Sequence, residues 1–272
     1  MINKYGGEIM TLQKYSASGN DFLITHTFIK KDYSKMAIKY CDRYNGVGAD
    51  GFIVLVPIYP DTKLSDRAKK EFSGKLSELD FEWLFYNSDG STAPLCGNGA
   101  RACALYAFNN SLANNSMKFL TEAGVIQCYV SYDVVEITLA KPKVIKEDFN
   151  EEGFNWWMVD TGVPHLVTFV DDLEKFDLQV CKTMRKTHNS NVNFATIKDN
   201  NLYVRTFERG VEAETQACGT GMAACYLRAY NLGYLSNTTR VYPISKELLT
   251  MKIQDNVLHL KGPVKKLFTV NI

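Results

Sequence analysis

Two cysteines stand at the head of closely similar segments. The segment that begins at Cys96 reads CGNGARACALYAFN, and the one that begins at Cys218 reads CGTGMAACYLRAYN. Glycines at the second and fourth positions permit a tight turn, and the Ala- and Leu-rich continuation predicts a helix. The unpaired N–H groups and the positive dipole end of a helix N-terminus stabilise a thiolate. Such a thiolate can act as a base, and its neutral twin can act as an acid.

The two segments also indicate how the chain is organised. They lie about one domain length apart and align without a gap, so a duplicated domain explains them better than chance. Two similar halves have a pseudo-symmetric cleft between them, and we expect this cleft to face Cys96 toward Cys218. Two opposed thiols of similar acidity suit a reaction in which an α-proton leaves one face of a substrate and returns on the other.

Four other roles for Cys96 and Cys218 compete with acid–base chemistry. A structural zinc site requires closely spaced cysteines or histidines, which neither turn supplies. A covalent Cys–His nucleophile needs only one such turn. A redox dithiol becomes available if the sulfur atoms lie close, as a side reaction or a regulatory state. The glycine turns alone suit a phosphate, although the chain has no GxxxxGKS/T sequence. Acid–base work by a symmetric pair accounts best for two equivalent turns.

Composition is that of an ordinary globular protein. The 272 residues suit two domains, and the net charge of +1 comes from 31 basic and 30 acidic side chains mixed along the chain. The sequence has no basic stripe and no membrane-length apolar run, so we expect a small-molecule partner and neither nucleic acid nor membrane. The first residues lack the apolar run of a secretory signal, and the seven cysteines are not densely spaced. We therefore expect free thiols and a cytoplasmic location.

Short strand-like runs outnumber helical ones, which predicts a mixed α/β fold with much antiparallel pairing. We expect strands at residues 22–24, 52–56, 81–86, 125–130, 134–139, 166–170, 192–197 and 202–207. We expect helices at residues 36–41 and from Gly97 and Gly219 onward. The second cysteines of the two segments, Cys103 and Cys225, lie about two helical turns beyond the first and are expected to be small buried residues.

Polar breaks suggest where the domains divide. A linker near 111–121 gives an N-terminal domain, residues 1–120, that carries Cys96, and a C-terminal domain, residues 121–263, that carries Cys218. A final strand at about 264–272 is expected to return to the first domain. Residues 59–80 are rich in charge and are interpreted as a solvated insertion of loop or short helix that carries no chemistry.

Seven motifs occur in one order over nearly the whole chain. They are SGNDF from Ser18, RYNGVGADG from Arg43, FYNSDGS from Phe85, CGNGAR from Cys96, TGVPH from Thr161, NVNF from Asn191 and VRTFERGVEAETQACGTG from Val204. In content and order they resemble the motifs of the diaminopimelate epimerase family. One such fragment would say little, whereas the full series includes both cysteine turns.

The resemblance implies two similar α/β domains, each a mixed sheet curled around a central helix, with the substrate between them and no cofactor or metal. It implies that Cys96 and Cys218 are catalytic, one as thiolate and the other as thiol, in the interconversion of LL- and meso-2,6-diaminopimelate for lysine and peptidoglycan precursor synthesis. It also implies a homodimer. The positions that match substrate contacts are Asn20, Asn87, Gly97, Asn98, Asn191, Glu208, Arg209, Gly219 and Thr220. His165 and Glu208 match groups that influence the thiols.

These residue types fit such a substrate on physical grounds. Amides and Arg209 suit a zwitterion with a distal amino-carboxylate end. The N–H groups at the two helix starts suit the α-carboxylate, whose charge grows as the α-carbon becomes carbanionic. Without the resemblance each residue is ordinary, because an Asn in a turn is usually structural and Glu208 with Arg209 can form a surface pair.

The chain departs from the family pattern at a few positions. Val163 replaces an Asn that many members carry, and Gly51 replaces a Gln. Ala213 stands where an acidic residue or Gly is usual, so a racemase of another amino acid, such as histidine, is the alternative on the same scaffold. A non-enzymatic amino-acid-binding protein would keep the glycine turns but would not require both thiols. Residues 1–9 are interpreted as an extension, an alternative start or a remnant of cloning, because Met10 gives the family's usual starting distance.

Overall fold

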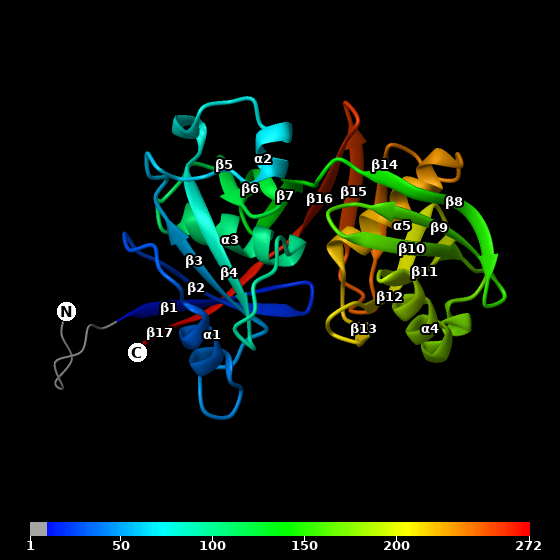
Figure 1. The fold of residues 1–272 in the computed structure, drawn as a ribbon, viewed down its shortest axis with the longest axis horizontal. Helices are drawn as coiled ribbons and strands as arrows, with labels where there is room; N and C mark the ends of the chain where they lie inside the picture. The colour runs from blue at the N-terminus through cyan, green and yellow to red at the C-terminus, as the bar shows by residue number, and fades with distance from the viewer. Residues whose placement is uncertain (1–9) are drawn as a thin grey trace. The chain divides into compact units, whose positions relative to one another are not determined.

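The computed structural model describes residues 10–272, apart from the side chains of residues 67, 70 and 71. The chain divides into two compact units, and Figure 1 shows that each contains both strands and helices. The first unit runs to Val135 and takes in Pro263–Ile272, and the second is Glu136–Gly262. The mixed α/β class expected from the sequence is confirmed. The predicted extension at residues 1–9 lies outside the described residues.

The division falls later than the sequence suggested. Half of the predicted linker at 111–121 is a strand, β5 (Ser116–Thr121), which pairs with β4 (Phe81–Asn87) and with β6 (Gly124–Ser131). These hydrogen bonds keep residues 116–131 in the first unit. The chain instead passes into the second unit within β7 (Val134–Thr138) and returns at the end of β16 (Val257–Pro263).

The first unit is built on one mixed sheet. Its strands, in spatial order, are β17 (Lys265–Asn271), β1 (Thr11–Ala17), β2 (Asn20–His26), β3 (Gly51–Val56), β4, β5 and β6. The pairs β2–β3 and β4–β5 are parallel and the others are antiparallel. The last strand, at residues 265–271, pairs with the first.

The second unit repeats this order. Its strands are β8 (Lys143–Glu151), β9 (Phe154–Asp160), β10 (Pro164–Phe169), β11 (Asn191–Lys198), β12 (Asn201–Glu208), β14 (Thr238–Tyr242), β15 (Leu249–Gln254) and β16, with β13 (Ala213–Thr215) paired to the end of β12. Its parallel pairs, β10–β11 and β12–β14, stand at the same places as those of the first unit. The duplication visible in the cysteine segments therefore extends to the whole sheet.

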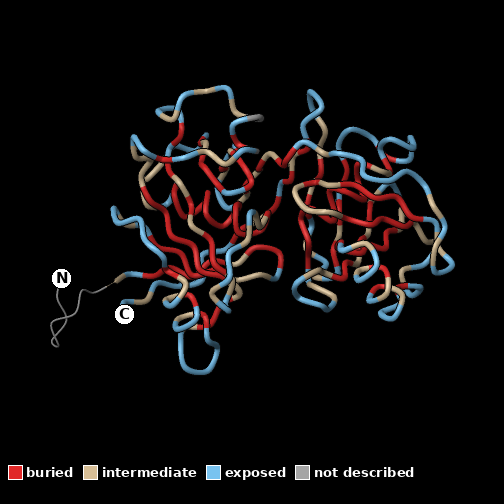
Figure 2. Tube along the Cα trace, viewed as in Figure 1, coloured by how far each residue is buried: buried red, intermediate tan, exposed pale blue. Residues whose placement is uncertain are grey.

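Each unit has one buried helix against its sheet. α3 (Gly97–Asn109) contacts β1, β2, β3 and β6, and α5 (Gly219–Asn231) contacts β9, β10, β11, β12 and β15. Both helices begin where the glycine turns predicted, and small side chains let them pack on strands from several sides. Cys103 and Cys225 are fully buried on them, as expected. Figure 2 shows the buried residues gathered in the strands and in these helices.

The remaining helices lie nearer the surface. They are α1 (Ser34–Cys41), α2 (Asp66–Glu71) and α4 (Leu178–His188), with short 3-10 turns at Leu76–Glu78 and Leu173–Lys175. Helix α4 was not predicted, because Cys181 and Met184 are its buried residues and the rest of its sequence is polar. The side chain of Asp177 caps it by accepting hydrogen bonds from two backbone N–H groups.

The insertion at 59–80 is less solvated than its composition suggested. Leu79 and Ala68 are buried with Leu120 of β5 in a small apolar cluster, to which Leu64 and Phe72 also pack. The insertion therefore adds a local core to the first unit.

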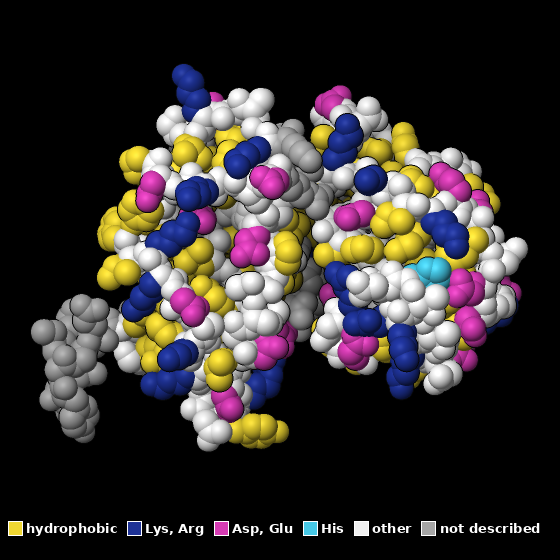
Figure 3. Space-filling view, viewed as in Figure 1, with side chains coloured by type: hydrophobic (Ala, Val, Ile, Leu, Met, Phe, Trp, Pro, Cys, Tyr) yellow, Lys and Arg dark blue, Asp and Glu magenta, His cyan; other side chains and the backbone are white. Residues whose placement is uncertain are grey.

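Charged side chains are distributed over the surface in Figure 3 as the nearly equal numbers of basic and acidic residues suggested. On the face shown in Figure 3, basic and acidic side chains are interspersed on each unit. No helix in the described part of the chain has the length and apolarity needed to cross a membrane.

Candidate active site

Cys96 caps the central helix of the first unit. Its backbone is extended, with φ −129° and ψ 115°, and its Sγ accepts a hydrogen bond from the N–H of Gly99 at 3.4 Å. Gly97 and Asn98 follow in the first helical turn and are buried. An N–H donor and the helix dipole both favour a negative charge on this sulfur. The turn therefore has the properties that the sequence predicted for a thiol that can lose its proton.

Two of the predicted substrate amides, Asn20 and Asn98, are hydrogen-bonded to each other. Asn98 Nδ2 donates to Asn20 Oδ1 at 2.8 Å, and Asn20 Nδ2 donates to the Asp50 carboxylate at 3.1 Å. At the other end, the fully buried Arg101 donates to Asn98 Oδ1 at 2.7 Å and to Ser18 Oγ at 2.7 Å. Because a carboxylate only accepts and a guanidinium only donates, both amides are held in one orientation.

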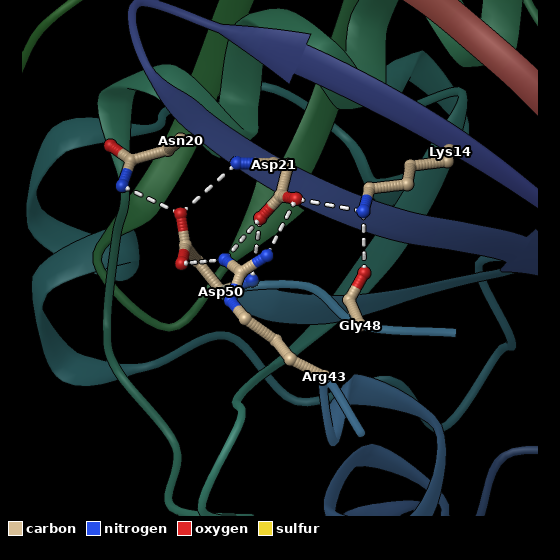
Figure 4. A network of polar contacts seen from close by, with 6 residues as sticks. All are labelled: Lys14, Asn20, Asp21, Arg43, Gly48 and Asp50. Atoms are coloured by element: carbon tan, nitrogen blue, oxygen red, sulfur yellow. Dashed lines mark hydrogen bonds and ion pairs between the residues drawn. The ribbon is translucent and has the colours of Figure 1, made fainter. Parts of the chain in front are cut away.

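An ion-pair network surrounds Asp50, whose carboxylate accepts the hydrogen bond from Asn20 (Figure 4). Arg43 bridges two carboxylates, with N–O distances of 3.0 Å to Asp21 and 2.7 Å to Asp50. Lys14 lies 2.8 Å from Asp21 and donates to the Gly48 carbonyl at 2.6 Å. Burial acts to raise the pKa of Asp21, but hydrogen bonds from Arg43 and Lys14 outweigh it and hold the pKa below its usual value.

Asn87 ends β4 opposite Gly51, the residue that follows Asp50. Its Nδ2 donates to Ser91 Oγ at 3.0 Å, and Ser91 in turn donates to the Asp89 carboxylate at 2.6 Å. The next residue, Ser88, donates its backbone N–H to the Asp50 carbonyl at 3.0 Å. Asp50 therefore contacts both the Asn20 side chain and the turn that carries Asn87.

The space beneath the Cys96 turn is apolar. A Cβ added at Gly51 would lie 2.6 Å from the Phe85 ring and 3.2 Å from the Phe22 ring, so the absence of a side chain at Gly51 makes room for both rings. A Cβ at Gly99 would lie 3.3 Å from Phe22. Gly51, which replaces a Gln of the family pattern, is therefore the residue that fits beside these two rings.

Cys218 occupies the N-cap position of the central helix of the second unit in a similar conformation, with φ −119° and ψ 108°, but without the side-chain capping hydrogen bond that Cys96 makes. It is 6% exposed, and its Sγ lies 3.5 Å from Thr220 Oγ1. Gly219 and Thr220 occupy the first helical turn, as Gly97 and Asn98 do in the first unit.

Glu208 ends β12, and its carboxyl group lies beside the Cys218 thiol. Burial raises the pKa of Glu208, and the neighbouring Cys218 thiol limits the rise. A carboxylate in contact with a thiol can accept its proton, so Glu208 lies where a residue that influences Cys218 should lie. Ala213 pairs with Glu208 across β12 and β13.

His165 is fully buried and contacts the Cys218 turn. Its Nε2 lies 2.9 Å from Thr220 Oγ1, and its Nδ1 lies 3.1 Å from Asn193 Nδ2. Burial lowers the pKa of His165 to about 3, and the Arg209 charge acts in the same direction. The ring is therefore neutral at ordinary pH and acts through hydrogen bonds rather than through charge.

Asn191 connects the remaining predicted residues of this unit. Its Oδ1 accepts the backbone N–H of Arg209 at 2.8 Å, and its Nδ2 donates to the Pro164 carbonyl at 3.2 Å. The Arg209 guanidinium donates to the Asn189 carbonyl at 2.9 Å.

The predicted residues thus fall into two groups, each described within its own unit. Asn20, Asn87, Cys96, Gly97 and Asn98 belong to the first, and His165, Asn191, Glu208, Arg209, Cys218, Gly219 and Thr220 belong to the second. Sequence reasoning gave no role to several residues that hold these groups in place, namely Asp50, Ser91, Arg101, Asn193 and Thr206. For Arg101, Asn193 and Thr206 the available signal was a polar side chain in an otherwise apolar helix or strand, whereas Asp50 and Ser91 lie outside the helices and strands and carried no such signal. In the described part of the chain, no three His, Cys, Asp or Glu side chains are grouped to hold a metal ion.

A structure-based comparison bears on the fold. A phenazine biosynthesis protein of the PhzF family from Enterococcus faecalis matches with a TM-score of 0.70, covering 97% of this chain and 99% of that chain at 15% identity. Identity this low shows the fold alone.

Sequence comparisons bear on the family. The family profile described as diaminopimelate epimerase matches residues 12–144 and 157–267. The diaminopimelate epimerase of a Nitratiruptor species is 52% identical over 95% of this chain and 97% of its own length. That of Campylobacter jejuni subsp. doylei is 45% identical over 96% and 98%. Since the matched ranges include both cysteine-capped helices and the polar groups around them, the chain belongs to the diaminopimelate epimerase family.

Proposed function

We propose that the chain interconverts LL- and meso-2,6-diaminopimelate, with Cys96 and Cys218 as the two proton-transfer groups. The family assignment makes the chain an isomerase. The single observation that carries the proposed mechanism is the repeated cysteine cap, because each unit presents one thiol at the start of a buried helix. In the proposed reaction one thiolate removes the α-proton and the other thiol delivers a proton to the opposite face.

The residues around each cysteine have the chemistry that this reaction requires. Backbone N–H groups at Gly97 and Gly219 begin the two helices, and such groups stabilise the negative charge that develops as the α-carbon loses its proton. Arg209 is suited to a substrate carboxylate, and Asn20, Asn87, Asn98 and Asn191 to polar groups at either end of the substrate. Glu208 and Thr220 complete the proposed contacts, with His165 and Glu208 acting on the Cys218 thiol. The reaction requires no added cofactor.

The reaction would supply lysine synthesis and peptidoglycan cross-linking. A cytoplasmic location, expected from the sequence, and a homodimer, implied by the family resemblance, are part of the proposal.

Solvent deuterium incorporation at the α-carbon tests the proposal. The chain, kept reduced and without added cofactor, is offered LL-diaminopimelate, histidine, lysine and glutamate separately in D₂O. Deuterium exchange and inversion confined to diaminopimelate are expected. The panel is needed because Ala213, opposite Glu208, departs from the family pattern. Inversion of another amino acid would make the chain a racemase of that substrate, and exchange with none would indicate a binding role.

Cysteine variants test the two-thiol assignment. Cys96→Ser and Cys218→Ser keep the geometry but replace each thiol with a hydroxyl of much higher pKa, so full epimerisation should be lost in both. Cys103→Ser is the matched control, because Cys103 lies on the same helix as Cys96 but is fully buried. Wild-type turnover in either Cys96→Ser or Cys218→Ser would contradict the assignment.

A further inference from the structure

The orientation of one buried amide, that of Asn193, is fixed by its surroundings. Asn193 is fully buried in β11, and its Nδ2 lies 2.7 Å from the Leu166 carbonyl. A carbonyl oxygen can only accept, so the atom that faces it must be the amide nitrogen. On its other side, Asn193 Oδ1 accepts a hydrogen bond from Thr206 Oγ1 at 2.9 Å. Exchanging the nitrogen and oxygen positions would break the contact with Leu166.

This orientation decides which nitrogen of His165 carries the proton. Asn193 Nδ2 faces His165 Nδ1 at 3.1 Å, so Nδ1 must be the acceptor and the proton of the neutral ring lies on Nε2. Nε2 faces Thr220 Oγ1 at 2.9 Å, which suits a donor. A competing contact, Asn191 Nδ2 to Nε2, is longer at 3.5 Å. The shorter contacts therefore select the Nε2–H tautomer.

The charged groups near His165 do not alter this result. Arg209 disfavours the doubly protonated ring, and burial lowers the pKa of His165 to about 3. The Glu208 carboxyl group lies beside Cys218. The ring therefore stays neutral near pH 7, and only one of its two nitrogens carries a proton.

We propose that Asn193 is a positioning residue that holds His165 as the Nε2–H tautomer and thereby directs the Thr220 hydroxyl proton onto Cys218 Sγ. Because Thr220 Oγ1 accepts from His165, its own proton is free to point toward the sulfur 3.5 Å away. Glu208 contacts the same sulfur and can accept the thiol proton. The donors then run in one direction, from Asn193 through His165 and Thr220 to Cys218.

This arrangement serves both protonation states of Cys218. As a thiol, the sulfur donates to Glu208 and still accepts from Thr220. As a thiolate, it keeps the Thr220 donor, so neither neighbour has to rotate when the proton is transferred. This catalytic consequence rests on the proposed function, whereas the tautomer and the direction of the Thr220 hydroxyl do not.

The first unit has no counterpart of this relay in its described structure. Strand register makes Phe22 the equivalent of His165, because Phe22 pairs with Gly51 as His165 pairs with Asn191. Two residues further along each strand, Ile53 is the equivalent of Asn193. Both residues are apolar and buried, so the relay is particular to the Cys218 turn.

Nitrogen NMR of the wild-type chain tests the tautomer without substrate. The chain contains four histidines, which can be labelled with ¹⁵N and observed in a two-bond ¹H–¹⁵N spectrum, with His165→Gln identifying the resonance. We expect His165 to be protonated on Nε2 and not on Nδ1 between pH 6 and pH 8. Protonation on Nδ1, or on both nitrogens, would overturn the proposal. Asn193→Asp should move the proton to Nδ1, because a carboxylate presents an acceptor to that atom.

The pH dependence of Cys218 alkylation tests the direction of the Thr220 hydroxyl. Iodoacetamide is used in a Cys96→Ala background, with the modified residue located by mass spectrometry. Burial raises the pKa of Cys41 and of Cys181 to about 12 and also raises the pKa of Cys103, Cys128 and Cys225, so these thiols should not compete.

Two substitutions at Thr220 separate the hydroxyl from the packing. Thr220→Val keeps the shape and removes the donor, so the thiolate should form at higher pH and alkylation at pH 7 should slow about threefold to tenfold. Thr220→Ser restores the hydroxyl and should restore the profile. Superimposable profiles for the wild type and Thr220→Val would show that Thr220 does not donate to the sulfur. If Thr220→Val shifts the alkylation profile but the wild-type chain shows no epimerase activity, the role of the Thr220 hydroxyl is supported and the proposed function is contradicted.

Discussion

Phe22 and His165 occupy equivalent positions in the two units, since Phe22 pairs with Gly51 across parallel strands in the register that His165 makes with Asn191. Phe22 contributes an aromatic ring to the apolar space beneath the Cys96 turn, whereas His165 hydrogen-bonds to the Cys218 turn through Thr220. The two units therefore share a cysteine at the N-cap position of the central helix but differ in the aromatic residue next to that turn.

Replacing His165 with the residue of the other unit should destabilise the protein. In His165→Phe the Asn193 amide and the Thr220 hydroxyl lose their buried partner, and we expect a loss of about 3 kcal/mol in the free energy of unfolding. Urea denaturation measures it. His188→Phe is the control, because His188 pairs with a partly exposed Glu151 and should cost less than about 1 kcal/mol. Equal losses would show that the buried hydrogen bonds of His165 contribute little.

The depressed pKa of His165 predicts a stability that depends on pH. The folded pKa, about 3, lies below the ordinary value of 6.5, so protons favour the unfolded chain, and the stabilisation is full above pH 6.5 and is lost as the pH falls toward 3. Between pH 7 and pH 5 this group should lower the free energy of unfolding by about 2 kcal/mol. Glu208, whose pKa is raised, acts in the opposite sense, favouring the fold at low pH.

A variant isolates this contribution. His165→Gln should show a shallower fall in stability from pH 7 to pH 5 than the wild type does. His26→Gln is the comparison, because burial also lowers the pKa of His26, but that side chain is only partly buried and the effect should be smaller. If His165→Gln and the wild type lose the same free energy over this range, His165 is not the titrating group.

Equivalent glycines in the two helices should respond differently to alanine. A Cβ at Gly221 would lie 2.3 Å from Asn193 Oδ1 and 3.2 Å from Thr206 Oγ1, whereas a Cβ at Gly99 would lie 3.3 Å from the Phe22 ring. Gly221→Ala should therefore cost about 2 kcal/mol, although alanine favours a helix, and Gly99→Ala should stay within about 1 kcal/mol of the wild type. Thermal or urea unfolding of the two variants decides the matter, and a larger cost at Gly99 would contradict the predicted order.

Removing the Asp50 carboxylate should weaken catalysis more than stability. Asp50→Ala frees the Asn20 amide to reorient, and we expect kcat/KM to fall about tenfold, mainly through KM. The carboxylate is 39% exposed, so its ion pair with Arg43 should contribute less than about 1 kcal/mol to stability. Asp50→Asn keeps an acceptor for Asn20 and should recover part of the loss.

The control for Asp50 is another exposed carboxylate that binds an arginine. Asp148 pairs with Arg228 at 2.5 Å and is 48% exposed, and Asp148→Ala should leave kcat/KM unchanged. A loss in Asp148→Ala as large as that in Asp50→Ala would attribute the effect to general loss of surface charge pairs.

Local sequence patterns were sufficient for the features set by local backbone chemistry. The starts of α3 and α5 followed from cysteine and glycine before an Ala-rich run, and strands such as β3 and β11 followed from runs of β-branched and aromatic residues. The strand β8 was missed, because its residues KVIKEDFNE are almost all exposed at the edge of the sheet and lack alternation. The unit boundary was misplaced, because the pairing of β5 with β4 is a long-range contact.

The sequence was sufficient to predict the chemical groups of the candidate site, but not the residues that hold those groups in place. The cysteines were evident from their repeat, whereas Asn193 and Arg101 have meaning only once the atoms that face them are known. Both are polar side chains with no exposed surface among apolar neighbours. A pattern can flag such a residue, but the direction of its hydrogen bonds depends on carbonyls contributed by distant segments, as with Pro263 for Arg101.

The pairing of β17 with β1 has a consequence for biosynthesis on the ribosome. Thr11 is opposite Asn271, and Thr11 Oγ1 donates to the Asn271 side chain at 2.9 Å. β1 therefore waits for a partner strand that is synthesised about 260 residues later, and until then one edge of its sheet has unpaired backbone groups. The second unit, Glu136–Gly262, is continuous in sequence and faces no such delay. Long sequence separation between partners slows folding, so the N-terminal unit should be the later of the two to reach its native state and the one with more need of chaperones during synthesis.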